Sequence, residues 1–261
     1  MSKVLPNIIL TVDELENIKK NSSSYLSGAE GIIIKEPDKQ TVRKLLLSEV
    51  KETDKTQEEL ERIRRNKYSK VIRLGTMDSL KNELKVSATI SDYQGKFIGY
   101  EMTSPVPLFP LDTNPFVSAD EKVYYLEQLK KRLLDLHEHG ILYGDIKESN
   151  VLWNSDQGII CFCDLDNTQI GTHPIDLVNY SISQFVDENG YISRGVDEYM
   201  FNILTLQQLF FQNTDYRTVI EKLKKMKPGE NATPEFAKTL RKMKRTTNYY
   251  DGGYLIDYLK K

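Results

Sequence analysis

Apolar residues in the first hundred positions come in short runs bounded by polar turns, which is the pattern of β-strands. The runs "GIIIKE" (31–36) and "TVRKLLL" (41–47) flank the turn "PDKQ" and predict a pair of strands. Further strands are expected at 70–74, 84–90 and 95–103, and a charged helix is expected at 55–68. The first part of the chain is therefore expected to be rich in strands.

A helical period begins at residue 118. Leucines and a valine recur three and four positions apart through 118–140. Ser118 and Glu121 have the spacing of a capping box, and Gly140 provides the glycine at which such a helix ends. This pattern predicts one long amphipathic helix.

The remaining pattern predicts the overall organisation. A hairpin is expected over 150–163 around the turn "SDQG", and an apolar helix, buried on most sides, over 197–212. The proline-rich stretch 104–116 separates these elements from the strand-rich part. We therefore expect an α+β protein of two lobes, a small strand-rich lobe at 1–103 and a larger helical lobe at 104–261.

Composition excludes several classes of protein. A net charge of −2 gives no global case for binding nucleic acid or membrane. The Lys/Arg-rich segment 217–245 is either a solvated helical face or a surface for an acidic partner or nucleic acid. No apolar run reaches ~18 residues and no signal-peptide pattern opens the chain, so we expect a cytoplasmic protein, with Cys161 and Cys163 as buried thiols.

Four polar residues interrupt the buried-looking stretches "ILYGDIKESNVL" and "IICFCDLDN". Asp145, Lys147 and Asn150 lie in the loop before the predicted hairpin, and Asp164 follows its second strand. Carboxylate and amide oxygens are ligands for a hard cation such as Mg²⁺, and an ammonium group can bind phosphate oxygens. A remaining carboxylate can accept the proton of a hydroxyl. These residues suit phosphoryl transfer.

This set resembles the catalytic loop and the metal-binding Asp of the eukaryotic-like protein kinase superfamily. The resemblance implies a bilobal kinase fold and phosphoryl transfer from ATP with Mg²⁺ to a Ser/Thr hydroxyl of an unidentified protein substrate. It implies Asp145 as the catalytic base and Lys147 as a ligand of the transferred phosphate. Asn150 and Asp164 become the metal ligands.

The resemblance extends to other positions. Lys44 fits the strand lysine that binds the α/β-phosphates, and Glu59, or failing it Glu58, fits its helical partner, with Ile63 packed behind. The nucleotide-binding positions are Gly28 and Gly31 of the Gly-rich loop, Ile33, Val42 and Leu152 around adenine, and the backbones of Glu101 and Thr103 at its edge. Tyr100 takes the gatekeeper position, and Asp197 takes that of the helical Asp that binds the catalytic-loop backbone.

Departures from the family pattern leave three functions open. Gly144 replaces an Arg, Asp166 replaces a Gly, and no Ala-Pro-Glu motif stands between 167 and 196. Gly144 is typical of small-molecule phosphotransferases such as aminoglycoside or choline kinases, whereas Lys147 is typical of Ser/Thr protein kinases. Asp166, which either adds to the cation site or marks a more rigid loop, favours a nucleotide-binding pseudokinase. The interpretation that we adopt is an active Ser/Thr protein kinase whose turnover does not require loop phosphorylation.

Overall fold

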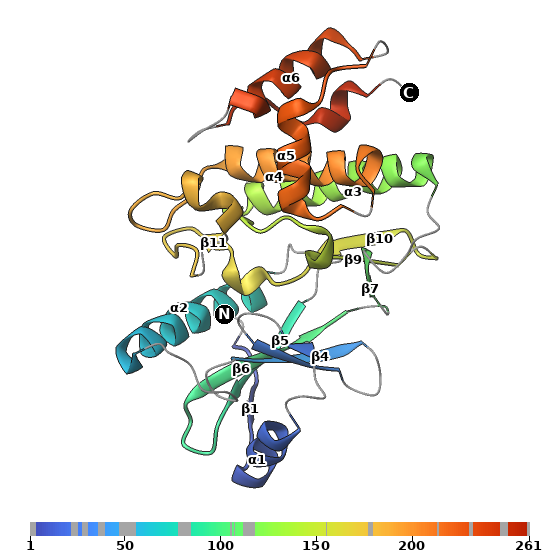
Figure 1. Ribbon diagram of the computed structural model, residues 1–261. Coiled ribbons are helices and arrows are strands. Elements are labelled where there is room, and N and C mark those ends of the chain that lie inside the picture. Colours follow the sequence, from blue (N-terminus) through green and yellow to red (C-terminus); the bar gives the residue numbers. More distant parts are fainter. Residues whose placement is uncertain are drawn as a thin grey trace. The chain divides into compact units, whose positions relative to one another are not determined.

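The protein is α+β in a computed structural model (Figure 1). The structure describes residues 4–21, 26–27, 31–35, 40–46, 56–77, 85–104, 106, 108–111, 118–154, 156–176, 180–212, 214–229, 232–245 and 250–259. The chain divides into two compact units, Met1–Leu108 and Phe109–Lys261. The predicted lobes 1–103 and 104–261 stay a prediction.

A mixed sheet forms the centre of the first unit. Its strands are β1 (Asn7–Ile9), β2 (Leu26–Ser27), β3 (Gly31–Lys35), β4 (Thr41–Leu46), β5 (Lys85–Ser91) and β6 (Phe97–Thr103). Their order is β1-β5-β6-β4-β3-β2, and β1 pairs with β5 in parallel whereas the other neighbours are antiparallel. The strands predicted at 31–36, 41–47, 84–90 and 95–103 are thus confirmed.

The N-terminal segment adds a strand and a helix that the hydrophobic pattern did not predict. The helix α1 (Val12–Lys20) starts with a capping box between Thr11 and Glu14. Leu10 and Leu15 pack into the apolar cluster that Ile32, Leu45, Ile90 and Ile98 form on the sheet. Because α1 has only nine residues and one buried side chain, its apolar period is weak, and the Thr-x-x-Glu spacing is the signal that could have revealed it.

The strand predicted at 70–74 is wrong, because these residues belong to the helix α2 (Gln57–Thr76). Val71, Leu74 and Gly75 are buried at helical spacing, and α2 packs against β5. The β-branched pair Val71 and Ile72 favours a strand locally, but burial of a helical face outweighs that preference. The charged helix predicted at 55–68 is confirmed and continues for two further turns.

The second unit begins with β7 (Phe109–Pro110) and the long helix α3 (Ala119–Glu138). The predicted capping box is confirmed, since Ser118 Oγ accepts from the Glu121 N–H and the Glu121 carboxylate accepts from the Ser118 N–H. Gly140 follows the helix with φ of 72°. The predicted hairpin is also confirmed, with β9 (Val151–Asn154) antiparallel to β10 (Ile159–Phe162), and β7 pairs with β9.

Short elements complete the region around the hairpin. These are β8 (Ile141–Leu142), η4 (Glu148–Asn150), η5 (Leu165–Asn167), β11 (Gln169–Ile170) and η6 (Tyr180–Phe185). The strand β11 pairs with β8, so the segment after the hairpin returns to the segment before it. This pairing brings the two polar stretches of the sequence into one region of the second unit.

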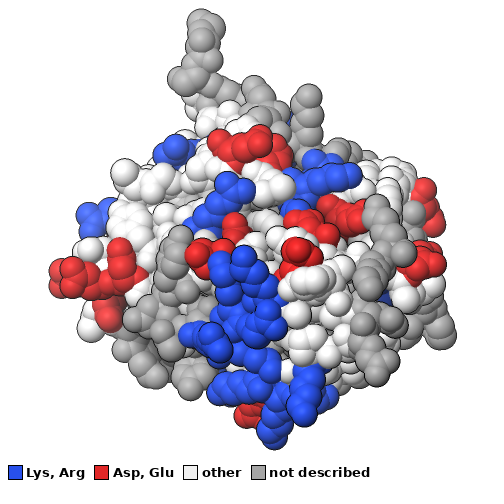
Figure 2. Space-filling view, turned by 90° about the horizontal axis from the view of Figure 1, so that it is seen from above, with Lys and Arg blue, Asp and Glu red and all other residues white. Residues whose placement is uncertain are grey.

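The predicted apolar helix is α4 (Arg194–Phe210), which starts three residues earlier than expected and is buried over most of its length. The helices α5 (Tyr216–Lys225) and α6 (Pro234–Arg245) and the turn η7 (Leu255–Tyr258) follow it. The helix α6 buries one face, and its buried residues are Phe236, Thr239, Leu240 and Met243. Figure 2, which views the side of the molecule on which α6 lies in Figure 1, shows Lys and Arg side chains gathered into one tract.

Within the described residues, no helix is both long enough and apolar enough to span a bilayer. The long helices α2 and α3 instead carry charged residues along their exposed faces.

Candidate functional site

The loop between β8 and β9 brings three of the predicted residues together. Lys147 Nζ lies 2.7 Å from Asp145 Oδ2, and Asn150 Nδ2 donates to the same oxygen at 2.8 Å. Asn150 Nδ2 also donates to the Asp145 backbone carbonyl at 3.0 Å, which closes the loop on itself. The Asp145 side chain is 15% exposed, so its carboxylate is largely shielded while both neighbours bind it. This arrangement holds a carboxylate in one orientation at the start of the hairpin.

The backbone before Asp164 is joined to this loop. The Cys163 N–H donates to the Asn150 carbonyl at 3.0 Å, and the Tyr143 hydroxyl donates to the Cys163 carbonyl. The next residue, Asp164, has φ of 63° and ψ of 35°, and it is the only non-glycine residue with positive φ in the described chain. Left-handed backbone at a residue other than glycine costs about 1–2 kcal/mol and occurs most often at functional sites. Asp164 is thus fixed in an unusual conformation beside the catalytic-loop candidate.

A buried carboxylate binds the backbone of this loop, as predicted. Asp197, in the first turn of α4, is fully buried. Its Oδ2 accepts from the Tyr143 N–H and its Oδ1 from the Gly144 N–H, both at 2.7 Å. The expectation that Asp197 binds the backbone of this loop is confirmed. Asp145 follows Gly144 directly in the chain, so Asp197 binds the backbone next to Asp145.

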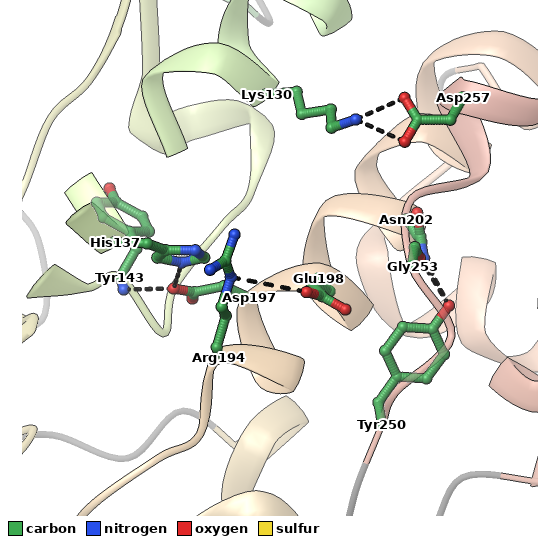
Figure 3. Close-up of polar contacts among 10 residues, drawn as sticks. All are labelled: Lys130, His137, Tyr143, Arg194, Asp197, Glu198, Asn202, Tyr250, Gly253 and Asp257. Carbon is green, nitrogen blue, oxygen red and sulfur yellow. Dashed lines mark hydrogen bonds and ion pairs between the residues drawn. The ribbon is translucent and has the colours of Figure 1, made fainter. Parts of the chain in front are cut away.

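A histidine completes this support, and the sequence did not reveal it. His137 Nε2 lies 2.8 Å from Asp197 Oδ2, and the His137 side chain is 2% exposed (Figure 3). His137 lies in the last turn of α3, and this local position gives no sign of its buried partner. Because the two residues are 60 positions apart, no local spacing indicates their contact.

The residue after Asp197 carries a second acidic group. Burial raises the pKa of Glu198, while Arg194, whose Nε lies 3.8 Å from Glu198 Oε1, and His137 oppose this shift. Figure 3 shows the side chains of Arg194 and Glu198 beside the pair of Asp197 and His137. The start of α4 therefore places two acidic side chains, Asp197 and Glu198, next to each other in the chain, with Arg194 close to Glu198.

The far end of the loop is tied to the same helix by a contact that the sequence also did not predict. Glu148 begins η4, and its carboxylate accepts from the side chains of Gln207, at 2.8 Å, and Gln208. Gln207 Nε2 also donates to the Thr214 carbonyl at 2.8 Å, just before α5. Both glutamines are buried in α4. The helix α4 thus binds the loop at Tyr143 and Gly144 through Asp197, and at Glu148 through two amides.

Gly144 occupies a position that a larger residue does not fit. Its φ is 73°, and a Cβ atom there would lie 2.7 Å from Ile175 Cδ1 and 3.0 Å from Ile192 Cδ1. A glycine at this position therefore suits both the left-handed backbone and the local packing.

The first unit gathers several predicted nucleotide-binding residues on one face of its sheet. Ile33 pairs directly with Lys44, and Lys44 pairs directly with Tyr100, so these three side chains form one row across β3, β4 and β6. Val42 lies two residues before Lys44 on the same face and pairs with Met102. Lys44 is 3% exposed. Their role toward adenine and phosphate stays a prediction.

Other predicted residues lie at defined places without a test of their role. Gly31 starts β3, where a Cβ atom would lie 2.4 Å from the Leu45 carbonyl oxygen, and Gly28 lies outside the described residues. Glu101 and Thr103 lie in β6 between β4 and β5, and Leu152 lies in β9 opposite Cys161. Trp153 is buried against the ring of Tyr125.

Glu59 has a contact that was not anticipated. It is the third residue of α2, and its carboxylate accepts from the Thr56 N–H at 2.8 Å and from Thr56 Oγ1 at 3.0 Å. Glu58 is exposed in the same turn, and Ile63 is half-buried one turn after Glu59. The predicted pairing of Lys44 with Glu59, or with Glu58, stays a prediction.

The donor atoms near the loop suit a hard cation in part. Asn150 uses Nδ2 to bind Asp145, which turns its carbonyl oxygen Oδ1 away from that carboxylate. With Asp164 it offers an amide oxygen and a carboxylate, both oxygen ligands of the kind that Mg²⁺ takes together with waters and phosphate oxygens. The described residues contain no cluster of three or more His, Cys, Asp or Glu side chains arranged to bind a metal. Phosphate oxygens would therefore have to complete the coordination.

Asp166, two residues after Asp164, is fully buried in η5.

Comparison with known proteins also bears on the function of the chain. No protein-family model matches the chain. The chain is 30% identical over 157 residues to a protein of Acanthamoeba polyphaga mimivirus named "Putative serine/threonine-protein kinase". The match covers 55% of this chain and 28% of the viral protein, so the chain spans less than a third of that relative. This similarity supports a kinase-like relationship and suggests phosphotransfer.

Proposed function

We propose that the protein transfers the γ-phosphoryl group of ATP to a Ser or Thr hydroxyl of a protein substrate. The observation that carries this proposal is the Asp145 carboxylate, bound through one oxygen by both Lys147 and Asn150. A carboxylate in a fixed orientation can align an acceptor hydroxyl and take its proton during transfer. The name of the viral relative adds independent support.

Each residue has a distinct role in the proposed reaction. Asp145 accepts the proton while the acceptor oxygen forms a bond to the γ-phosphorus and the bond between that phosphorus and the β–γ bridging oxygen breaks, which leaves ADP. Lys147 binds the oxygens of the transferred group, and Asn150 and Asp164 would hold Mg²⁺. The cation would offset the negative charge of the phosphate oxygens. Lys44, held by Glu59, would bind the α/β-phosphates, as the resemblance implies.

The direct test is incubation of the purified protein with γ-labelled ATP and Mg²⁺, with and without a cell lysate. Label on the protein itself or on lysate proteins is the expected result. The matched variant is Asp145→Asn, which keeps the shape of the side chain but cannot accept a proton. It should lose transfer by ~10²-fold or more and still bind nucleotide. Equal loss of nucleotide binding would contradict the assignment of Asp145 as the base.

A second candidate function is phosphoryl transfer to a small molecule. Gly144 favours it, because this residue is typical of that group and its left-handed backbone leaves no room for the usual Arg. Label on a small molecule in the lysate fraction, with none on protein, would support this function. Nucleotide that is bound and never turned over would instead support the pseudokinase interpretation.

A further inference from the structure

The C-terminal helices α5 and α6 carry an excess of positive charge on a chain that is acidic overall. Residues 214–245 contain ten Lys and Arg against four Asp and Glu, whereas the whole chain has a net charge of −2. Six exposed side chains in this segment are called here the basic surface: Lys224, Lys225, Lys227, Lys238, Arg241 and Arg245. The rest of the molecule is correspondingly acidic, so this charge is localised.

The fold of α6 places its basic residues on the solvent side. Lys238, Arg241 and Arg245 recur at intervals of three and four residues, which puts them on one face of the helix. The opposite face, with Phe236, Leu240 and Met243 among its residues, is buried. The basic side chains from Lys238 to Arg245 therefore follow ~10 Å of one exposed helical stripe.

A hydrogen bond joins α6 to the end of α5. Lys244 Nζ donates to the carbonyl of Met226. Lys225 and Lys227 flank Met226 in the chain, and Arg241 lies one turn before Lys244 on α6. The two helices thus bring their basic residues to one corner of the second unit, in agreement with the tract of Lys and Arg in Figure 2.

Part of this positive charge has no acidic partner among the residues that the structure describes. Asp251 pairs with Lys242 at 2.9 Å, and Lys238 also acts electrostatically on Asp251. Among the residues that the structure describes, no Asp or Glu forms an ion pair with Lys225, Lys227 or Arg241. Like charges within the Debye length of about 8 Å repel one another, so an anionic partner would stabilise this corner.

The composition of the surface distinguishes between anionic partners. Proteins that bind single-stranded nucleic acid combine positive charge with exposed aromatic rings on which bases stack. The exposed aromatic side chains that the structure describes include Tyr68, Tyr93, Tyr124 and Phe210, and the ring of Phe210 packs against Phe236 of α6 with 6.2 Å between centroids. A long polyanion would also meet the acidic remainder of the molecule, whereas a short one would not. The short length of the stripe therefore favours a short acidic polypeptide segment.

We propose that the basic surface of α5 and α6 is a docking site for a short Asp/Glu-rich segment of a partner protein. The proposal goes beyond the proposed phosphoryl transfer and does not depend on it, because the surface is tested by binding alone. Carboxylates of the segment pair with Lys225, Lys227 and Arg241 at the corner and with Lys238 and Arg245 along α6. Arginine contributes bidentate pairing with carboxylates.

The experiment measures fluorescence anisotropy of a short labelled peptide of Asp, Glu and Ser with the full chain, at low and at raised salt. The variant Lys225→Glu/Lys227→Glu/Arg241→Glu should weaken binding by about tenfold or more. The matched control, Lys19→Glu/Lys20→Glu/Arg73→Glu, changes the net charge equally at exposed residues of the first unit and should leave the affinity within about twofold. Binding by the parent should weaken as salt is raised.

Several outcomes would overturn the proposal. One is equal affinity for the peptide and for a neutral peptide of Asn, Gln and Ser. Another is equal loss of affinity in the two charge-reversal variants. A third is tighter binding of a single-stranded oligonucleotide or of anionic lipid vesicles than of the acidic peptide. Thermal unfolding of each variant at the parent's temperature excludes loss of fold as the cause, and the variant with Gln at the same three positions serves if the Glu variant unfolds.

Discussion

The imidazole of His137, at the end of α3, contacts the carboxylate of Asp197, in the first turn of α4, with 2.8 Å between Nε2 and Oδ2. Since Asp197 also accepts from the N–H groups of Tyr143 and Gly144, one buried carboxylate joins two helices to the loop that carries Asp145. Geometry at Asp145 therefore depends on a residue that has no place in the proposed reaction itself.

The first prediction concerns Asp197→Asn. An amide can accept from one of the two backbone N–H groups, but its own N–H₂ then faces the other donor. A buried donor without an acceptor and the loss of hydrogen bonds to a charged carboxylate together cost about 3 kcal/mol. Urea denaturation should show a decrease of that size in the free energy of unfolding. The control Asp251→Asn changes an exposed carboxylate that pairs with Lys242 and should leave the free energy of unfolding close to that of the parent. Equal effects of the two variants would contradict the structural role of Asp197.

The second prediction concerns Gly144→Ala. A methyl group would meet the side chains of Ile175 and Ile192, and the positive φ disfavours any residue with a Cβ atom. Together these effects should lower the free energy of unfolding by about 2 kcal/mol. Gly229→Ala is the matched control, because a Cβ atom there has no neighbour within 4 Å. It should leave the midpoint of urea denaturation unchanged or slightly higher, and a similar loss in both variants would refute the packing argument.

Local rules predicted much of the fold, and tertiary contacts account for the errors. The capping box at Ser118, the hairpin at 150–163 and the strands of the first unit follow from spacing and turn residues, which are local signals. The segment 70–74 was assigned to a strand because its side chains favour one, but the structure buries it as the continuation of α2. Sequence reasoning thus works where neighbours in the chain determine the structure.

The candidate site shows the same limit. The loop residues Asp145, Lys147 and Asn150 are close in the chain, so their grouping could be predicted. The contacts of His137 with Asp197 and of Glu148 with Gln207 connect residues about 60 positions apart, and no periodicity encodes them. The roles of Lys44 and Glu59 stay predictions, because they depend on a nucleotide and on residues far apart in the chain.

The third prediction concerns Glu148→Ala and rests on the proposed function. Removal of this carboxylate releases η4 from Gln207 and Gln208, and η4 ends at Asn150. If Asn150 is held less firmly, the reacting groups should be aligned less well in the transition state. Binding of the substrates in the ground state should change less. We therefore expect kcat to fall by about tenfold with KM for ATP changed by less than about twofold. Steady-state assays with the labelled substrate measure both constants.

A structural measurement separates this prediction from the proposed function. Amide hydrogen exchange at 148–151 should become faster in Glu148→Ala, whether or not the parent transfers phosphate. Glu138→Ala, which alters an exposed glutamate at the end of α3, should change neither exchange nor kcat. Unchanged exchange in Glu148→Ala would show that the two glutamines do not hold the loop. A parent without turnover but with the expected exchange would count against the proposed function alone.

The fourth prediction concerns the pH dependence of stability through Glu198. Burial raises the pKa of this carboxyl in the folded chain above its ordinary value of 4.5, against the opposing effects of Arg194 and His137. Between the unfolded and the folded pKa values, the folded state binds more protons, so stability falls as pH rises through that interval.

The variant Glu198→Gln tests this effect. Its amide cannot titrate, so the variant should not show this decrease in stability. Its stability relative to the parent should therefore increase as pH rises above 4.5 and become constant once the folded carboxyl is ionised. Urea denaturation at a series of pH values measures this difference. A difference between Glu198→Gln and the parent that stays constant or narrows with rising pH would mean that Arg194 and His137 outweigh burial at this site.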